Sequence, residues 1–239
     1  MRSPEVDLAR FLAMILMAIY HLAFDLQSFY DWDIDLDRLP WRILQQTTLH
    51  AFLALVGVSA VLMRQRTTVT VPYRIFLRRA LTILSSAMVI TLVTALIDPA
   101  SSIRFGVLHC IGVSLIFLPL FLPLGAWNAV LGMGILLIGN TIGTIVMETS
   151  LLLPFGIVPP GFTSLDYVPL FPNLGTILLG IGFGHVLYVR GVRSSTWQSP
   201  AWMRTISVPG KYALAFYLVH QVVILAILFV VLGRPIHQP

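Results

Sequence analysis

The sequence predicts an all-α, polytopic integral membrane protein, a helical bundle of about seven transmembrane helices. Hydrophobic residues make up 57% of the 239 positions and charged residues 10%, which leaves too few polar side chains to cover a soluble globule of this size. The apolar runs are close to the roughly 20 residues that cross a bilayer as a helix. They lack the strict alternation that a membrane β-barrel requires.

Seven apolar runs are expected to be helical spans, because backbone polar groups in lipid must pair within their own segment. The runs cover residues 8–29, 43–63, 76–97, 105–123, 127–147, 170–189 and 212–232. Residues 148–169 are too polar and too rich in proline to span, so we expect an outer interfacial loop or a lid there. The whole chain, 1–239, is expected to form a single transmembrane domain.

The charges between the runs predict the orientation. Four aspartates and no base occupy residues 31–37. Two other connections carry bases and no acid, namely Arg64, Arg66, Arg74, Arg78 and Arg79 in one and Arg190, Arg193, Arg204 and Lys211 in the other. Because basic connections stay in the cytoplasm, the N-terminus is predicted inside and the C-terminus outside. We expect the protein to lie in the inner membrane of the cell, with the lipid bilayer as its partner.

Two functional classes are disfavoured by composition. The formal charge of +5 comes from basic residues between the apolar runs, which serve as topology signals and do not predict nucleic-acid binding. The single cysteine, Cys110, and the absence of a CxxC or His/Cys set with zinc spacing predict no metal site.

The first span carries polar side chains on one helical face. Asp7, Arg10, Met14, His21 and Asp25 recur at spacings of 3, 4, 7 and 4 residues, which places them on one stripe. Such groups are costly within lipid and normally face a cavity or a partner. Asp7 and Arg10 form either an interfacial ion pair or part of a site.

His21 and Asp25 lie one turn apart in the outer third of this span. A carboxylate at that spacing can orient an imidazole and support its protonated form, as general acid–base catalysis requires. A buried structural hydrogen bond is the alternative.

Other spans contribute polar groups near the outer side and near the cytoplasmic side of the membrane. In the fourth span Arg104 is expected at the outer boundary and His109 deeper, at a depth that matches His21. In the seventh, Tyr217, His220 and Gln221 fall within one turn and suggest a polar cavity or an interhelical contact. On the cytoplasmic side, Arg78, Arg79 and Lys211 either anchor the helices at lipid headgroups or bind phosphate.

Four segments resemble the small bacterial proteins grouped with the catalytic domain of heparan-α-glucosaminide N-acetyltransferase. They are EVDLARFLAMILMAIYHLAFDL at 5–26, RFGVLHCIG at 104–112, SLDYVPLFPNLG at 164–175 and GKYALAFYLVHQ at 210–221. The wider superfamily of transmembrane acyltransferases is similar in carrying an arginine and a histidine on its first catalytic helix. The lysosomal enzyme uses a histidine in the loop after this helix, whereas residues 30–39 contain none.

The resemblance implies transfer of an acyl group, usually acetyl, from cytoplasmic acetyl-CoA to a small saccharide-like acceptor outside. His21, oriented by Asp25, would then be the base, with His109 as a further catalytic candidate. The expected contacts to acetyl-CoA are Arg10, Arg78, Arg79 and Lys211. The candidates for binding the acceptor or the oxyanion are Arg104, Asp166, Asn173, Tyr217 and Gln221. Direct transfer and a covalent acyl-His21 intermediate stay open.

Three other functions stay open on the sequence. A proton-coupled transporter would use His21, Asp25 and His109 as a relay and would not consume acyl-CoA. A cytochrome with His21 and His109 as haem ligands would be coloured. In a membrane assembly subunit the polar groups would serve packing alone. A homodimer is a further open possibility.

Overall fold

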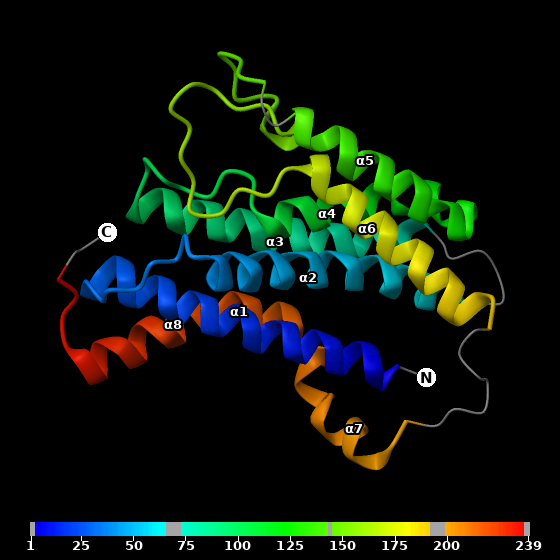
Figure 1. Ribbon diagram of the computed structural model, residues 1–239, viewed down its shortest axis with the longest axis horizontal. Coiled ribbons are helices and arrows are strands. Elements are labelled where there is room, and N and C mark those ends of the chain that lie inside the picture. Colours follow the sequence, from blue (N-terminus) through cyan, green and yellow to red (C-terminus); the bar gives the residue numbers. More distant parts are fainter. Residues whose placement is uncertain (1–2, 66–72, 143–144, 192–198, 237–239) are drawn as a thin grey trace. The chain divides into compact units, whose positions relative to one another are not determined.

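The computed structural model describes residues 3–65, 73–142, 145–191 and 199–236, and the side chains of 140–142 are left out (Figure 1). The part of the chain that is described is helical and contains no strand, so the predicted all-α class is confirmed. The α-helices are α1 (Pro4–Tyr30), α2 (Leu39–Gln65), α3 (Tyr73–Ile97), α4 (Val107–Phe121), α5 (Asn128–Ile142), α6 (Leu170–Gly184), α7 (Ala201–Ile206) and α8 (Ala213–Leu232). Short helical turns are η1 (Leu122–Trp127), η2 (Leu153–Phe155), η3 (His185–Val189) and η4 (Val208–Tyr212).

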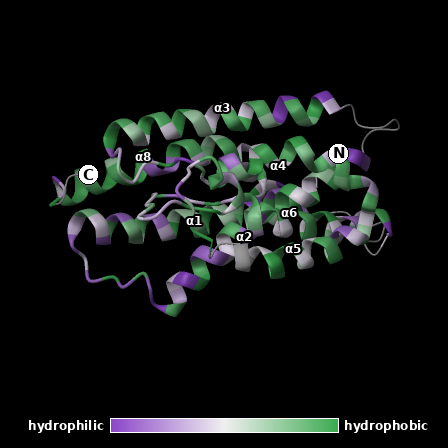
Figure 2. Ribbon diagram, turned by 90° about the horizontal axis from the view of Figure 1, so that it is seen from above, coloured by the Kyte–Doolittle hydropathy of each residue, from purple (hydrophilic) through white to green (hydrophobic). Residues whose placement is uncertain are grey.

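Six helical stretches in these ranges are long and apolar enough to cross a membrane, which makes the chain a multi-pass membrane protein. They are Pro4–Tyr30, Leu39–Gln65, Tyr73–Ile97, Val107–Gly139, Leu170–Val189 and Ala201–Leu232. Hydrophobic residues cover most of their length, and hydrophilic ones gather at the ends and in the connections (Figure 2). The fourth stretch covers most of two of the seven predicted spans, 105–123 and 127–147.

The residues form two compact units. The first consists essentially of Leu53–Trp197, and the second combines Arg2–Phe52 with Gln198–Pro239. Helix α2 contributes to both, while the first and last long helices, α1 and α8, belong to the second unit. The prediction of one domain over the whole chain stays a prediction.

In the first unit the chain reverses between α4 and α5. Gly125 has a positive φ of 55°, and a Cβ there would lie 2.8 Å from Nε2 of His185, at the end of α6. The opposite ends of the two helices lie beside the start of α6, because Cys110 Sγ is 3.8 Å from the Pro169 carbonyl oxygen and Gly139 lies against Pro172. The stretch Val107–Gly139 therefore runs along α6 in both directions.

In the second unit α1 and α8 run in the same direction. Asp25 contacts Gln221, and further along both helices the Tyr30 hydroxyl donates to the Gly233 carbonyl at 3.1 Å. Two parallel first and last helices require an odd number of crossings, whereas six crossings would make them antiparallel. The seven-pass count and the orientation of the termini stay predictions.

The proline-rich segment folds onto the connection between α3 and α4, within the first unit. Leu165 N–H donates to the Ser101 carbonyl at 2.8 Å, and Val168 N–H donates to the Phe105 carbonyl at 2.9 Å. Earlier in the segment Met147 N–H donates to the Val158 carbonyl at 3.2 Å. The predicted fifth span, 127–147, therefore runs past the end of its helix, since residues 145–147 are not helical and Met147 bonds to this segment.

Candidate active site

Helix α1 carries the predicted polar face without interruption. Pro4 stands at the start of the helix, where its missing N–H costs nothing, and Glu5 and Asp7 in the first turn suit the positive end of the helix dipole. The helix continues until Asp31, which has a left-handed backbone with φ 52°. Asp7, Met14 and Asp25 on the predicted stripe are all buried.

A carboxylate clamp joins α1 to α8 in the second unit. The amide nitrogen Nε2 of Gln221 donates to both oxygens of Asp25, at 2.7 Å to Oδ1 and 2.9 Å to Oδ2. Asp25 is 0% exposed. A carboxylate without a donor at such a position would be strongly destabilising, so Gln221 holds Asp25 in place.

Next to this clamp two histidine rings meet edge to face. The ring centroids of His21 on α1 and His220 on α8 are 5.0 Å apart, with an interplanar angle of 62°. The ring of Phe216 stacks on His220 at 5.6 Å, and the ring of Tyr217 lies 5.8 Å from it. The structure thus brings together five of the groups that the sequence placed on these two helices: His21, Asp25, Tyr217, His220 and Gln221.

The partners within this group differ from the predicted ones. The sequence paired His21 with Asp25, but both oxygens of Asp25 accept from Gln221, and the ring contact of His21 on α8 is with His220. His220 was recognised as a polar residue of the seventh span but given no role. Its position beside Gln221, on the same helical turn as Tyr217, is the sequence feature that could have indicated a role for His220.

The hydrogen bonds of His220 fix its tautomer. Its Nδ1 lies 2.7 Å from the carbonyl oxygen of Tyr217 and 3.2 Å from that of Phe216. A carbonyl oxygen only accepts, so Nδ1 carries the hydrogen and the neutral ring keeps a lone pair on Nε2. This Nε2 is buried and has no hydrogen-bond partner in the described part of the chain.

His109, the other predicted catalytic histidine, lies in the first unit and has both ring nitrogens engaged. The backbone N–H of Gly106 donates to Nδ1 at 3.2 Å, which caps the start of α4. The Nε2 nitrogen lies 3.4 Å from the Thr91 hydroxyl, whose own proton goes to the Ile103 carbonyl at 2.6 Å. Nε2–H of His109 is therefore the donor to Thr91. This arrangement holds α4 against α3.

Three predicted acceptor-binding or oxyanion candidates also lie in the first unit. Asp166 Oδ2 accepts from the N–H of Val107 at 2.9 Å, at the start of α4. Asn173 Nδ2 donates to the Pro169 carbonyl at 2.8 Å, and the guanidinium carbon of Arg104 lies 5.8 Å from the centre of the Phe162 ring. The bond of Asp166 fixes the segment 164–173 to the start of α4, while that of Asn173 lies within the segment.

Tyr167 reinforces the same loop. Its hydroxyl donates to the Leu153 carbonyl at 2.8 Å, and burial raises its pKa to about 12. The phenol therefore stays a neutral donor at physiological pH.

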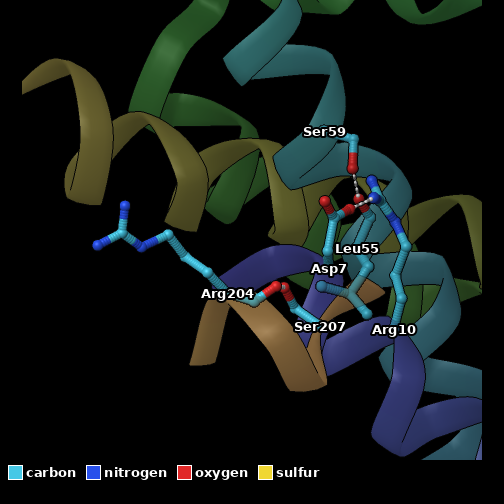
Figure 3. Close-up of polar contacts among 6 residues, drawn as sticks. All are labelled: Asp7, Arg10, Leu55, Ser59, Arg204 and Ser207. Carbon is cyan, nitrogen blue, oxygen red and sulfur yellow. Dashed lines mark hydrogen bonds and ion pairs between the residues drawn. The ribbon is translucent and has the colours of Figure 1, made fainter. Parts of the chain in front are cut away.

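The predicted cytoplasmic end of α1 carries an ion pair. Arg10 Nη1 donates to Asp7 Oδ1 at 2.6 Å, and Figure 3 shows the two side chains directed toward each other. Asp7 is 4% exposed, and its Oδ2 has no partner among the residues that the structure describes. In the same unit Gly210 packs against α1, because a Cβ on it would collide with the Asp7 carbonyl. Lys211, which follows, is exposed.

The other predicted phosphate contacts lie at the start of α3, in the first unit. Arg78 and Arg79 are exposed and, with Arg74, line a hollow of about 670 Å³ on that helix. Arg66, from the same basic connection, and Arg193, from the second one, lie outside the described residues.

Comparison with known families gives the activity class. The family described as heparan-alpha-glucosaminide N-acetyltransferase, catalytic, matches residues 2–222. The chain belongs to this family. Comparison with curated proteins and comparison with solved structures each found no match.

Membership in the N-acetyltransferase family makes the chain a membrane acetyltransferase in general terms. The matched region includes all of α1 and the first half of α8, and it ends one residue after Gln221, so the whole group of His21, Asp25, His220 and Gln221 lies within it. Among the described residues no cluster of three His, Cys, Asp or Glu side chains could hold a metal ion.

Proposed function

We propose that the protein transfers an acetyl group from cytoplasmic acetyl-CoA to a hydroxyl or amine on the outer side of the cell's inner membrane, with a small saccharide as acceptor. The observation that carries this proposal is the buried polar group of the second unit. Two imidazoles meet there beside a carboxylate held by an amide, all on helices apolar enough to span. Such groups are expensive in lipid and are typical of functional sites.

An imidazole of this pair supplies the acid–base chemistry of acyl transfer. The acceptor oxygen or nitrogen attacks the thioester carbonyl carbon while the imidazole takes its proton. The carbon–sulfur bond then breaks, and the CoA thiolate leaves and receives that proton. Donors such as the hydroxyl of Tyr217 would stabilise the negative charge on the carbonyl oxygen. His109, Arg104, Asp166 and Asn173 stay predicted contributors from the first unit.

The basic side chains on the predicted cytoplasmic side suit the phosphates of CoA. Arg74, Arg78 and Arg79 gather around one hollow on α3, and phosphate contacts are charge-assisted. In the second unit Arg10 and His21 are separated by about 16 Å along α1, at 1.5 Å rise per residue. An extended pantetheine arm would have to bridge such a distance to carry the thioester from the basic side to the histidines.

The proposal is tested with purified protein in liposomes, acetyl-CoA and glucosamine as the amine-bearing probe. We expect release of one CoA thiol for each acetylated product detected by mass spectrometry. The single cysteine of the protein, Cys110, is buried and adds little to the thiol signal. A proton-coupled transporter would leave acetyl-CoA intact, and that result would overturn the proposal.

A further inference from the structure

Two neighbouring side chains of α8 have hydrogen-bonding atoms that the described part of the chain leaves unpaired. They are Nε2 of His220 and Oε1 of Gln221, and both are buried. We propose that these two atoms bind the nucleophilic X–H group of the acetyl acceptor and that His220 Nε2 is the base that takes its proton. This assignment rests on the proposed acetyl transfer and names the catalytic residue within the histidine pair.

The backbone prepares His220 for this role. Because Nδ1–H is committed to the carbonyl of Tyr217 at 2.7 Å, the neutral ring presents only a lone pair at Nε2. A carbonyl that accepts from Nδ1 also stabilises the ring after Nε2 has gained a proton, since the positive charge strengthens that bond. The side chain is 8% exposed, so its nitrogen is shielded from competing bulk water.

Gln221 presents an acceptor for a related reason. Its amide nitrogen donates to both oxygens of Asp25, at 2.7 and 2.9 Å. The amide therefore cannot turn over without losing both bonds, and Oε1 is left as an acceptor. A buried acceptor without a donor is unfavourable, so a ligand that supplies a donor is favoured at this position.

Both free atoms accept, so they select a ligand group that donates. A neutral primary amine has two N–H donors and can reach both atoms, whereas a hydroxyl has one hydrogen, which goes to His220 Nε2. A fully ionised phosphate or carboxylate would be repelled by the two lone pairs. In the reaction the X–H bond breaks as X bonds to the acetyl carbon, and the proton goes to His220 Nε2. It then goes to the sulfur of CoA as the thioester bond breaks. The atoms balance without a further reactant.

His220→Asn is the decisive variant. An asparagine amide can keep the donor in the position of Nδ1 and its bond to the Tyr217 carbonyl, but it has no atom in the place of Nε2. We expect turnover of acetyl-CoA with glucosamine to fall about 10²–10⁴-fold, the range for loss of a general base, while acetyl-CoA binds as in the wild type. The matched control is His50→Asn on α2, which should keep turnover within about twofold.

A rescue experiment separates a chemical role from a structural one. His220→Ala should regain part of its turnover with added imidazole, increasingly as the pH rises and more imidazole is neutral. Near-normal turnover of His220→Asn, or no rescue in a His220→Ala protein that binds acetyl-CoA, would overturn the assignment. If neither variant folds, His220 has a structural role, and that result would also contradict its assignment as the base. Failure of the wild type to release CoA would instead overturn the proposed function.

Discussion

The two units treat their buried histidines in opposite ways. In the first unit His109 uses Nδ1 to accept from Gly106 and Nε2 to donate to Thr91. In the second unit His220 uses only Nδ1, and its buried Nε2 has no partner in the described ranges. A histidine whose nitrogens are both engaged stabilises a helix start, whereas one with an unpaired acceptor is available to a ligand.

The carboxylates show the same contrast. Asp166 accepts from the backbone N–H of Val107 at the start of α4, where the helix dipole favours a negative charge. Asp25 accepts from a side chain of another helix, 196 residues away along the chain. Asp166 therefore fixes a loop to a helix start within the first unit, while Asp25 depends on the pairing of α1 with α8 and fixes Gln221 beside the histidines.

Gln221→Leu would produce the largest change in stability. It leaves the carboxylate of Asp25 buried without the two bonds that hold it, at a cost of about 3 kcal/mol in the free energy of unfolding. Thermal unfolding of the purified protein in detergent measures this. Adding Asp25→Asn should recover part of the loss, because a neutral amide costs less to bury than a charge. An unchanged unfolding temperature in Gln221→Leu would show that the clamp contributes nothing.

Asp166→Ala probes the corresponding carboxylate of the first unit. Removing the side chain that caps α4 should lower the free energy of unfolding by about 1 kcal/mol, as for other helix caps. Asp166→Asn keeps an oxygen acceptor and should recover most of the lost free energy of unfolding. The comparison between the units fails if Asp166→Ala destabilises the protein more than Gln221→Leu does.

The sequence predicted the helices well because lipid leaves so few alternatives. The predicted run 170–189 coincides with α6 and η3, and 212–232 differs from α8 by one residue. The stripe of α1 also follows directly from its spacing. Local patterns could not predict that Asp25 bonds to Gln221 and not to His21, because that choice depends on how two distant helices pack.

The α4–α5 reversal shows a second limit of sequence reasoning. Apolar composition continues through residues 107–139, and the two predicted spans were separated only by a short gap. What reverses the chain is the backbone of Gly125, whose positive φ the composition does not reveal. The hydrogen bonds of His109 to Gly106 and Thr91 were not predicted either, since they depend on how the α3–α4 connection folds.

Arg78→Ala and Lys211→Ala should have smaller effects, on binding of the donor. Each is expected to weaken acetyl-CoA affinity about fivefold at low salt and less at high salt, because exposed ion pairs are screened. Titration calorimetry at two salt concentrations measures this, with Arg38→Ala, in the acidic connection after α1, as the control. Unchanged acetyl-CoA affinity in both variants would show that these residues anchor the helices at lipid headgroups and do not bind the donor.

Tyr167 should have the smallest effect, and only at alkaline pH. Its pKa is raised from 10.0 to about 12, so its contribution to stability is complete below pH 10 and is lost as the pH rises through 12. Tyr167→Phe should therefore lose less stability than the wild type between these values. Identical unfolding curves of the wild type and Tyr167→Phe at alkaline pH would exclude this contribution of the Tyr167 hydroxyl to stability.

The most direct test of the central claim, that the polar group of the second unit performs acetyl transfer, is His21→Ala assayed for binding and transfer in parallel. Removing this ring takes away one imidazole of the pair and the neighbour that lies against His220, but leaves the basic contacts to CoA. We predict that acetyl-CoA affinity stays within about twofold while CoA release falls at least about tenfold, and by less than in His220→Asn, because the base itself remains. Near-normal CoA release in a folded His21→Ala protein would contradict the account.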